Sequence, residues 1–327
     1  MNAARPVAVV IPSWNSAGLL PDCLGSLAEQ GVELETVVVD NGSTDGSLDY
    51  LRRQGVRHVA LPRNLGFAAA VNRGVAETRA PAVLVLNADA VLEPGAVARL
   101  LERLEADAAL GGVQPRILQL EQGGVRDVDS ARLYSAGQAL TADGRGFELG
   151  AGEAQSDSYL RPREVFGVCG AACLLRRRLL DELGGYDERY FSFYEDVDLN
   201  VRGRIAGRRF AYVPEAVAWH LGNASWIAEA PQPSAWNARL VARNRIATQA
   251  KFVPLRALPR ILLVEVGALA RAASQRRLRA TLRGKLEGLR LLPEMLRERR
   301  RLAREGELAA ARTWLGASAA APALRGR

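Results

Sequence analysis

The first hundred residues alternate between short, wholly apolar runs and longer segments with helical spacing, and this alternation restricts the possible folds more than any other feature. Runs at 7–12, 35–40 and 82–90 are predicted strands, and 66–78 is a predicted helix. A strand that lacks a polar face must be covered on both sides, which intervening helices do. The sequence therefore predicts βαβ units and a mostly parallel central sheet flanked by helices, a fold of the α/β class.

Polar residues follow the predicted strands at the points where the strands end. Ligands of open α/β sheets bind outside the carboxyl ends of the strands, so we expect these residues to share one crevice. No G-x-G-x-x-G pattern follows the first strand, which argues against a dinucleotide site. The polar clusters are Ser13 with Asn15, Asp40 with Asn41, Arg63 with Asn64, and Asn87 with Asp89.

Two of these clusters have a functional and a structural interpretation. Asp89 lies two residues after Asn87, so in an extended chain both side chains point to the same side. Such oxygen ligands suit Mg²⁺ or Mn²⁺, but a simple turn also favours Asn and Asp. Asp40 could accept hydrogen bonds from a base or a ribose, or the segment 40–46 could be only the turn that caps the next helix.

The middle of the chain, from about 114 to 162, is rich in Gly, Asp, Ser and Gln and has weak periodicity. We expect a long loop excursion there, with short strands at most. Regular patterning resumes at 164 with a predicted strand and a helix closed by Gly184 and Gly185.

The segment 190–200, YFSFYEDVDLN, places three carboxylates directly behind four aromatic rings. Anions in the first turn of a helix are favourable by about 0.3–1 kcal/mol, so Glu195, Asp196 and Asp198 could simply open a helix. Asp198 and Arg202 have the i, i+4 spacing of a surface ion pair, and we assign Asp198 mainly to structure. Helical spacing of the apolar residues supports a helix here: Val197, Val201 and Ile205.

Six motifs of the chain occur in the order seen in family 2 glycosyltransferases, and the resemblance covers approximately residues 6–225. It is strongest to the rhamnosyltransferase-type branch that builds bacterial surface polysaccharides. The resemblance implies the A-type glycosyltransferase fold and transfer of a sugar from a nucleotide diphosphate donor, with inversion and usually with a divalent metal. The motifs are VVIPSWNSAGLLPDCLGSLAEQ, VVVDNGSTDGS, NLGFAAAVNRGV, VLVLNADA, GAACLLRRRLLDELGGYDERYFSFYEDVDLNVRGRIAG and VPEAVAWHLGNAS.

By this resemblance, Asp196 is the general base that deprotonates the acceptor hydroxyl, and Glu195 helps to orient the acceptor or the base. Asp89 and His220 are the expected metal ligands, although a lone histidine can also be structural. For each of the following residues, turn or cap chemistry is the alternative. The resemblance assigns the acceptor and the sugar to Gly170, Ala171 and Tyr194, and the donor to Pro12, Asn15, Asp40, Arg63, Asn64, Gly66, Asn72 and Asn87.

The resemblance also predicts the substrates at the level of the branch. We expect rhamnose from dTDP-rhamnose, moved onto a glycan or polyprenyl-linked acceptor in the synthesis of bacterial cell-surface glycans. A UDP-sugar donor is the alternative within the mechanism, and a non-catalytic nucleotide-sugar-binding or scaffold protein is the alternative outside it. A nucleotidyltransferase would usually carry a Gly- and Lys-rich phosphate loop after the first strand, which the sequence lacks.

Charge divides the chain into an acidic front and a basic back. Residues 239–327 carry 21 Lys and Arg against 6 Asp and Glu, a net charge of +15, whereas residues 1–238 carry 23 against 30, a net charge of −7. We predict a catalytic domain at 1–235 and a basic, amphipathic helical region at 236–327. This region could lie on an anionic membrane surface, at about 1 kcal/mol per Arg. It could instead be a solvated bundle or a homodimer element. No motif for binding nucleic acid accompanies it.

The N-terminus and the cysteines indicate the compartment. The first fifteen residues lack the pattern of a signal peptide, and the apolar run at 261–264 is far shorter than the roughly 20 residues that span a bilayer. Cys23, Cys169 and Cys173 have neither disulfide nor zinc-site spacing, which favours reduced thiols. We therefore expect a cytoplasmic protein, peripheral on the inner face of the cell membrane.

Overall fold

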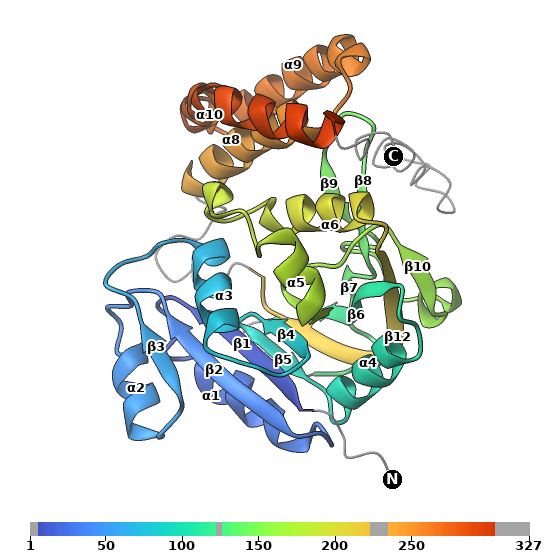
Figure 1. The fold of residues 1–327 in the computed structure, drawn as a ribbon. Helices are drawn as coiled ribbons and strands as arrows, with labels where there is room; N and C mark the ends of the chain where they lie inside the picture. The colour runs from blue at the N-terminus through green and yellow to red at the C-terminus, as the bar shows by residue number, and fades with distance from the viewer. Residues whose placement is uncertain (1–5, 122–125, 223–234, 305–327) are drawn as a thin grey trace.

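A ten-stranded mixed sheet forms the centre of the structure, a computed structural model that describes residues 6–121, 126–222 and 235–304. Figure 1 shows helices on both sides of this sheet and a separate layer of helices, α8 to α10, above it. The last part of the predicted helical region 236–327, from residue 305 on, lies outside the described residues.

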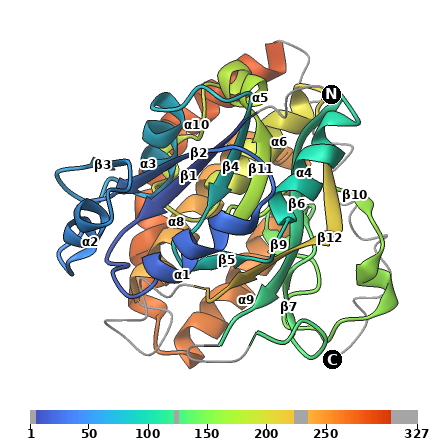
Figure 2. The ribbon, with the colours of Figure 1, turned by 90° about the horizontal axis from the view of Figure 1, so that it is seen from below.

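The strand order confirms a mostly parallel sheet flanked by helices. The order is β10-β12-β6-β11-β4-β1-β2-β3, and Figure 2 shows it from β3 at one edge to β10 at the other. β1 pairs in parallel with both β2 and β4, as the βαβ pattern predicts, whereas β11 is antiparallel to β4 and β6. The strands are β1 (Val7–Ser13), β2 (Leu34–Asp40), β3 (His58–Ala60), β4 (Ala82–Leu86), β5 (Ala90–Leu92), β6 (Leu110–Gln119), β7 (Leu133–Ser135), β8 (Gln138–Leu140), β9 (Gly146–Glu148), β10 (Arg163–Val165), β11 (Ala172–Arg176) and β12 (Arg209–His220).

Alternate residues of the strands pack into two cores, one on each face of the sheet. Val9 of β1 points into the core that α1, α2 and α4 cover, and Val10 points into the core that α3, α5 and α6 cover. This two-sided burial explains why the strands are apolar throughout. The helices are α1 (Leu20–Gly25), α2 (Ser47–Arg53), α3 (Phe67–Ala76), α4 (Ala96–Glu105), α5 (Arg177–Leu183) and α6 (Glu195–Ile205).

The prediction of a loop excursion at 114–162 is wrong in its first part. Residues 110–119 form β6, a buried strand in the middle of the sheet, and β8 and β9 pair as a short hairpin further along. Two features hid β6: Gly111 and Gly112 at its start, and Gln114 and Pro115 within it. Gln114 is tolerated there because its amide donates to Ser135 Oγ (3.0 Å) and accepts from the Cys169 N–H (2.7 Å).

The C-terminal helices pack against α6 and the loop before it. α10 crosses α8 so closely at Gly284 that a Cβ atom there would overlap the Arg239 carbonyl oxygen, so this position requires glycine. Lys251 lies near the C-terminal end of α8, and its Nζ is 2.6 Å from Oδ1 of Asp198 in α6. None of the helices in the described residues has the length and apolar content needed to cross a membrane. The helices are α8 (Ala235–Phe252), α9 (Leu258–Ser274) and α10 (Leu278–Arg304).

The three cysteines are free thiols and all are buried, as the sequence predicts. Burial raises the pKa of each, so the thiols are protonated at neutral pH.

Candidate active site

A cavity of about 290 Å³ opens at the carboxyl ends of β1 and β4 and brings most of the predicted residues together. The lining residues come from distant parts of the chain, as expected for the crevice of an α/β sheet. From the donor, metal, acceptor and catalytic predictions it includes Pro12, Asn64, Gly66, Asn87, Asp89, Gly170, Ala171, Tyr194, Glu195, Asp196 and His220.

Asp196 lies at the start of α6 with its carboxylate held by three donors. Oδ2 accepts from the Gln138 side-chain amide (3.0 Å) and from the Gly170 N–H (3.1 Å), and Oδ1 accepts from the Val197 N–H (2.7 Å). Burial raises the pKa of Asp196, and these hydrogen bonds oppose the rise. The carboxylate is therefore fixed in orientation while it faces the cavity.

The loop before α6 has an unusual backbone. Phe191, Phe193 and Tyr194 have φ values of 65°, 68° and 70°, although none is glycine. Such conformations persist only where the surroundings enforce them, and here Asn244 of α8 does so. Its buried side-chain amide donates to the carbonyls of Tyr190 (2.8 Å), Ser192 (2.8 Å) and Phe193 (2.7 Å). Helix α8 thus holds the loop in place. We call the three aromatic residues of this loop that line the cavity the aromatic wall: Phe191, Phe193 and Tyr194.

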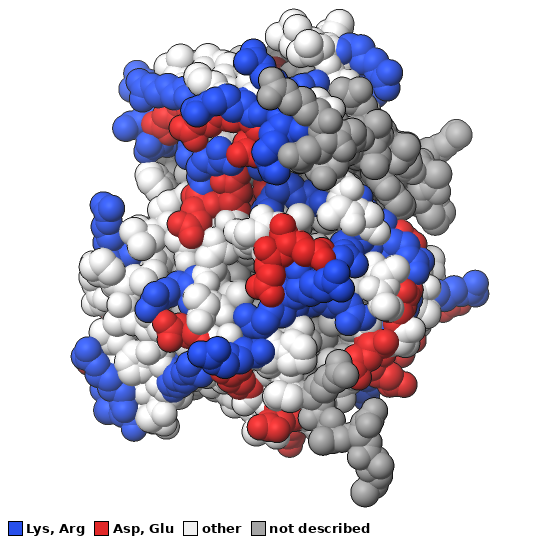
Figure 3. Space-filling view, in the orientation of Figure 1, with Lys and Arg blue, Asp and Glu red and all other residues white. Residues whose placement is uncertain are grey.

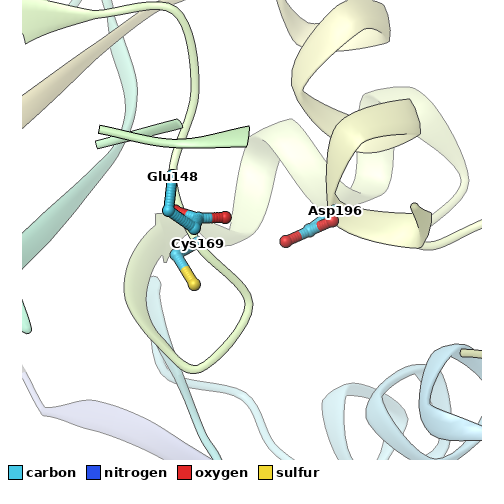
Figure 4. A group of neighbouring side chains, drawn as sticks. All are labelled: Glu148, Cys169 and Asp196. Atoms are coloured by element: carbon cyan, nitrogen blue, oxygen red, sulfur yellow. The ribbon is translucent and has the colours of Figure 1, made fainter. Parts of the chain in front are cut away.

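Glu148 was missed in the sequence, and it faces Asp196 across the cavity (Figure 4). Glu148, Cys169 and Asp196 have potential ligand atoms that all lie within 4.8 Å of one another. The Gln138 amide bridges the two carboxylates, since it also donates to Glu148 Oε1 (3.1 Å). Burial and the charge of Asp196 raise the pKa of Glu148 to about 7.

The raised pKa of Glu148 predicts a measurable pH dependence. Between about pH 4.5 and 7, the folded state binds this proton more tightly than the unfolded state, so stability falls as the pH rises. Glu148→Gln removes this titration. The wild-type free energy of unfolding should therefore drop relative to the variant by roughly 3 kcal/mol across that window, measured by urea denaturation. Glu102→Gln, an exposed change on α4, should follow the wild type. If the free energy of unfolding of the wild type and of Glu148→Gln changed with pH in the same way, the raised pKa of Glu148 would be contradicted.

Asp89, Asn87 and His220 also line the cavity and lie close to one another. His220 ends β12 and is buried beneath an edge-on contact with Tyr134, with ring centroids 4.4 Å apart. Its Nε2 lies 3.1 Å from Asp89 Oδ1 and 3.1 Å from Asn87 Nδ2. These two contacts make opposite demands, because the carboxylate needs a proton on Nε2 and the amide needs its lone pair.

A divalent cation fits this trio. With a cation between them, Nε2 and the carboxylate both present lone pairs, and a flipped Asn87 would add its amide oxygen. Asn87 Oδ1 is buried and has no hydrogen-bond partner among the described residues. The Glu148 cluster fits less well. The Cys169 thiol is kept protonated by burial, and both Glu148 oxygens already accept hydrogen bonds, from Ser135 and Gln138.

The other two carboxylates of the 190–200 segment have different surroundings. Glu195 lines the cavity, and burial, followed by the charge of Asp196, raises the pKa of its carboxyl group well above its usual range. Asp198 is structural as predicted, but its pairing with Arg202 is fully buried rather than on the surface (2.6 Å). The reason is α8, whose Lys251 covers the pair.

Four predicted donor residues do not line the cavity. The Asn72 side-chain amide donates to the Tyr186 carbonyl (2.9 Å), and its oxygen accepts from the Tyr186 N–H (2.8 Å). The Asn15 carboxamide oxygen accepts from the Thr44 N–H (2.9 Å) in the next turn. Arg63 is exposed, and Asp40 is buried at the end of β2.

One carboxylate oxygen of Asp40 is available to accept a hydrogen bond. Its Oδ2 accepts from the Ser43 N–H (3.2 Å), whereas Oδ1 has no hydrogen-bond partner within the described ranges. The next residue, Asn41, does line the cavity and positions Gly66 through its amide (3.1 Å to the carbonyl). A Cβ at Gly66 would lie 2.5 Å from the Phe191 carbonyl oxygen, so the close approach of these two segments requires glycine.

Comparison with curated proteins finds several glycosyltransferases. The chain is 33% identical over 211 residues to the N-acetylglucosaminyl-diphospho-decaprenol L-rhamnosyltransferase of Mycobacterium tuberculosis, covering 57% of this chain and 66% of that one. It is 29% identical over 230 residues to an N-acetylglucosaminyltransferase of Mesorhizobium japonicum, covering 65% of this chain and 50% of that one. The matches thus span about half to two thirds of these relatives.

Solved structures share the fold at low sequence identity. A mannosyltransferase from Pyrobaculum calidifontis, solved with GDP-Man and Mn²⁺, aligns with a TM-score of 0.51 at 21% identity over 95% of this chain and 87% of that one. GalNAc-T7, solved with UDP, GalNAc and Mn²⁺, aligns with a TM-score of 0.55 at 17% identity over 74% of this chain and 48% of that one. The predicted A-type glycosyltransferase fold with a helical C-terminal region is confirmed.

The family model for glycosyl transferase family 2 matches residues 8–184, which is more than half of the chain and includes most of the cavity-lining strand ends. The chain therefore belongs to glycosyl transferase family 2, in the branch that includes rhamnosyltransferases.

Proposed function

We propose that the protein is an inverting, metal-dependent glycosyltransferase that moves rhamnose from dTDP-rhamnose onto a lipid-linked acceptor sugar in bacterial cell-surface glycan synthesis. The observation that carries the proposal is that one cavity is lined both by Asp196 and by the adjacent Asp89 and His220. The rhamnosyl donor and the lipid-linked acceptor come from the name of the mycobacterial relative.

In the proposed reaction Asp196 acts as the general base. Its carboxylate removes the proton from the acceptor hydroxyl as that oxygen forms a bond to the anomeric carbon. The bond from the anomeric carbon to the nucleoside diphosphate breaks on the opposite face, so the configuration inverts. The Gln138 and Gly170 donors hold Oδ2 in place, and Glu195 and Tyr194 line the acceptor side. The aromatic wall excludes water and so limits hydrolysis of the donor.

Asp89 and His220, with the Asn87 amide, would hold a Mg²⁺ or Mn²⁺ ion, which supplies positive charge for the leaving diphosphate. The nucleoside would lie against Pro12, Asn64 and Gly66, where Asp40 Oδ1 could accept a hydrogen bond from the base or the ribose. A UDP-sugar donor is the second candidate, since the Mesorhizobium relative is named an N-acetylglucosaminyltransferase.

The proposed cellular place is the cytoplasmic face of the membrane. Leucines that are half or more exposed lie on η4 (Leu255–Ala257) and on α9: Leu255 is 75% exposed, Leu262 59% and Leu263 74%. Figure 3 shows Lys and Arg side chains gathered over the same helical layer. Exposed leucines beside basic side chains suit an anionic lipid surface.

Calorimetric titration with dTDP, UDP and GDP, each with Mn²⁺ or with chelator, tests the donor proposal. We expect dTDP to bind best and to need Mn²⁺, and Asp89→Asn to weaken that binding at least tenfold. Asp45→Asn, outside the cavity in the turn after β2, is the matched control and should keep the affinity. A preference for UDP would replace the rhamnosyl donor with a UDP-sugar. Equal affinity in chelator would contradict the metal site.

A further inference from the structure

A second cavity, of about 470 Å³, lies between α8 and α9, and we call it the α8–α9 groove. Its walls are mostly small apolar side chains, with alanines and valines from both helices and Gly267 from α9. Four arginines also line it: Arg145, Arg245, Arg271 and Arg277. An apolar slot with several guanidinium groups suits a molecule that has both a hydrocarbon chain and an anionic head.

The groove adjoins the active-site cavity. Val241 of α8 lines both cavities, and Arg145 in the groove directly precedes Gly146, which lines the active site. Tyr194 of the aromatic wall lies near both Arg245 and Arg145. Burial raises the pKa of Tyr194, and the charges of these two arginines oppose that rise. A ligand could therefore occupy both cavities at once.

The groove has more cations than carboxylates. Arg145 pairs with Asp143 (2.8 Å), and Glu265 pairs with both Arg245 and Lys285. Arg271 and Arg277 have no carboxylate partner in the part of the chain that the structure describes. Burial and the charge of Arg245 lower the pKa of Lys285 to about 8. Cations in this setting are stabilised when an anion binds.

Helix α9, which forms one wall of the groove, also has exposed apolar side chains. Val264 and Ala268 face the groove, and on the same helix Leu262, Leu263 and Val266 are 59%, 74% and 66% exposed. Exposed apolar side chains next to an apolar slot would cover a hydrocarbon chain that leaves the slot.

We propose that the α8–α9 groove binds the isoprenoid diphosphate part of the lipid-linked acceptor. The arginines would hold the diphosphate, and the hydrocarbon chain would lie between α8 and α9 and continue over the exposed leucines. The acceptor sugar would then lie in the adjoining cavity, with its hydroxyl at Asp196. This inference rests on the proposed function, because it identifies the acceptor of the same site.

Farnesyl diphosphate, a short isoprenoid diphosphate, is the probe, titrated into the full chain with saturating dTDP so that the donor pocket is occupied. We expect binding that weakens at least tenfold in the double variant Arg271→Gln/Arg277→Gln, because this variant loses the charge-assisted hydrogen bonds from both guanidinium groups to the diphosphate. Arg279→Gln/Arg290→Gln removes the same charge from exposed positions of α10 and should bind like the wild type. Inorganic pyrophosphate should bind more weakly than farnesyl diphosphate, because it lacks the chain.

Three results would overturn the inference: no binding of farnesyl diphosphate, equal affinity in the two double variants, or pyrophosphate that binds as tightly as farnesyl diphosphate. The last would leave only a general anion site. Failure here is distinct from failure of the proposed function, since the titration involves no sugar transfer. If the groove variants bind the probe normally while dTDP still binds with Mn²⁺, the groove is wrong and the donor site stands. Arginine-dependent probe binding without any sugar transfer supports the groove and contradicts the proposed activity.

Discussion

Asp196→Asn is expected to lower kcat for sugar transfer by about 10²- to 10⁴-fold while nucleotide affinity stays near that of the wild type. The substitution keeps the size of the side chain but removes its ability to accept a proton. The asparagine oxygen can still accept from Gln138 and Gly170, whereas its amide nitrogen loses the hydrogen bond from the Val197 N–H. Steady-state kinetics with dTDP-rhamnose, together with calorimetry of dTDP binding, measures both quantities.

Asp198→Asn is the matched control for this prediction, because it lies two residues further along the same helix. Its carboxylate is fully buried between Lys251 and Arg202, away from the cavity lining. It should lower stability and leave kcat per folded molecule largely unchanged. An Asp196→Asn variant with kcat close to that of the wild type would remove Asp196 from the role of base.

Lys251→Met is expected to lower the free energy of unfolding by roughly 3 kcal/mol. The Lys251 ammonium is 2% exposed and lies 3.0 Å from Asp187 and 2.6 Å from Asp198. Its removal leaves two buried carboxylates with one cationic partner fewer. Burial opposes ionisation of Asp187, yet hydrogen bonds from Arg189 and Lys251 hold its pKa well below the usual range.

Urea denaturation measures this loss, and Arg290→Met, an exposed change on α10, is its control with an expected effect within about 0.5 kcal/mol. Because Lys251 joins α8 to α6, the same variant should also loosen the contact between the C-terminal helices and the active site. If the two variants unfolded at the same urea concentration, the buried ion cluster would not be a stabilising link.

The sequence predicted the parts of the site that follow from strand topology. Asn64, Asn87 and Asp89 line one cavity because they follow parallel strands that end at the same edge of the sheet. This rule needs only the positions of the strands, which apolar runs reveal locally. It does not give side-chain direction, so the hydrogen bond between Asn72 and the Tyr186 backbone does not follow from it.

Two residues of the site could not be found from the sequence. Gln138 and Glu148 lie on strands of three residues each, too short for a periodic signal, in a segment that reads as loop. Their role depends on contact with Asp196, 58 residues after Gln138 in the chain. Burial of Asp198 was hidden for a similar reason, since Lys251 follows it by 53 residues and the i, i+4 spacing with Arg202 suggests a surface pair.

Analysis of the transfer product directly tests whether the protein transfers rhamnose with inversion of configuration. The full chain would be incubated with dTDP-rhamnose, Mn²⁺ and an N-acetylglucosaminyl-diphospho-polyprenol, and the anomeric configuration of any product would be determined by NMR. We expect a rhamnosylated lipid in which the anomeric configuration of the rhamnose is opposite to that in the donor. The Asp196→Asn variant should not form this product. A product that keeps the configuration of the donor, or no transfer from any nucleotide sugar that binds, would contradict this expectation.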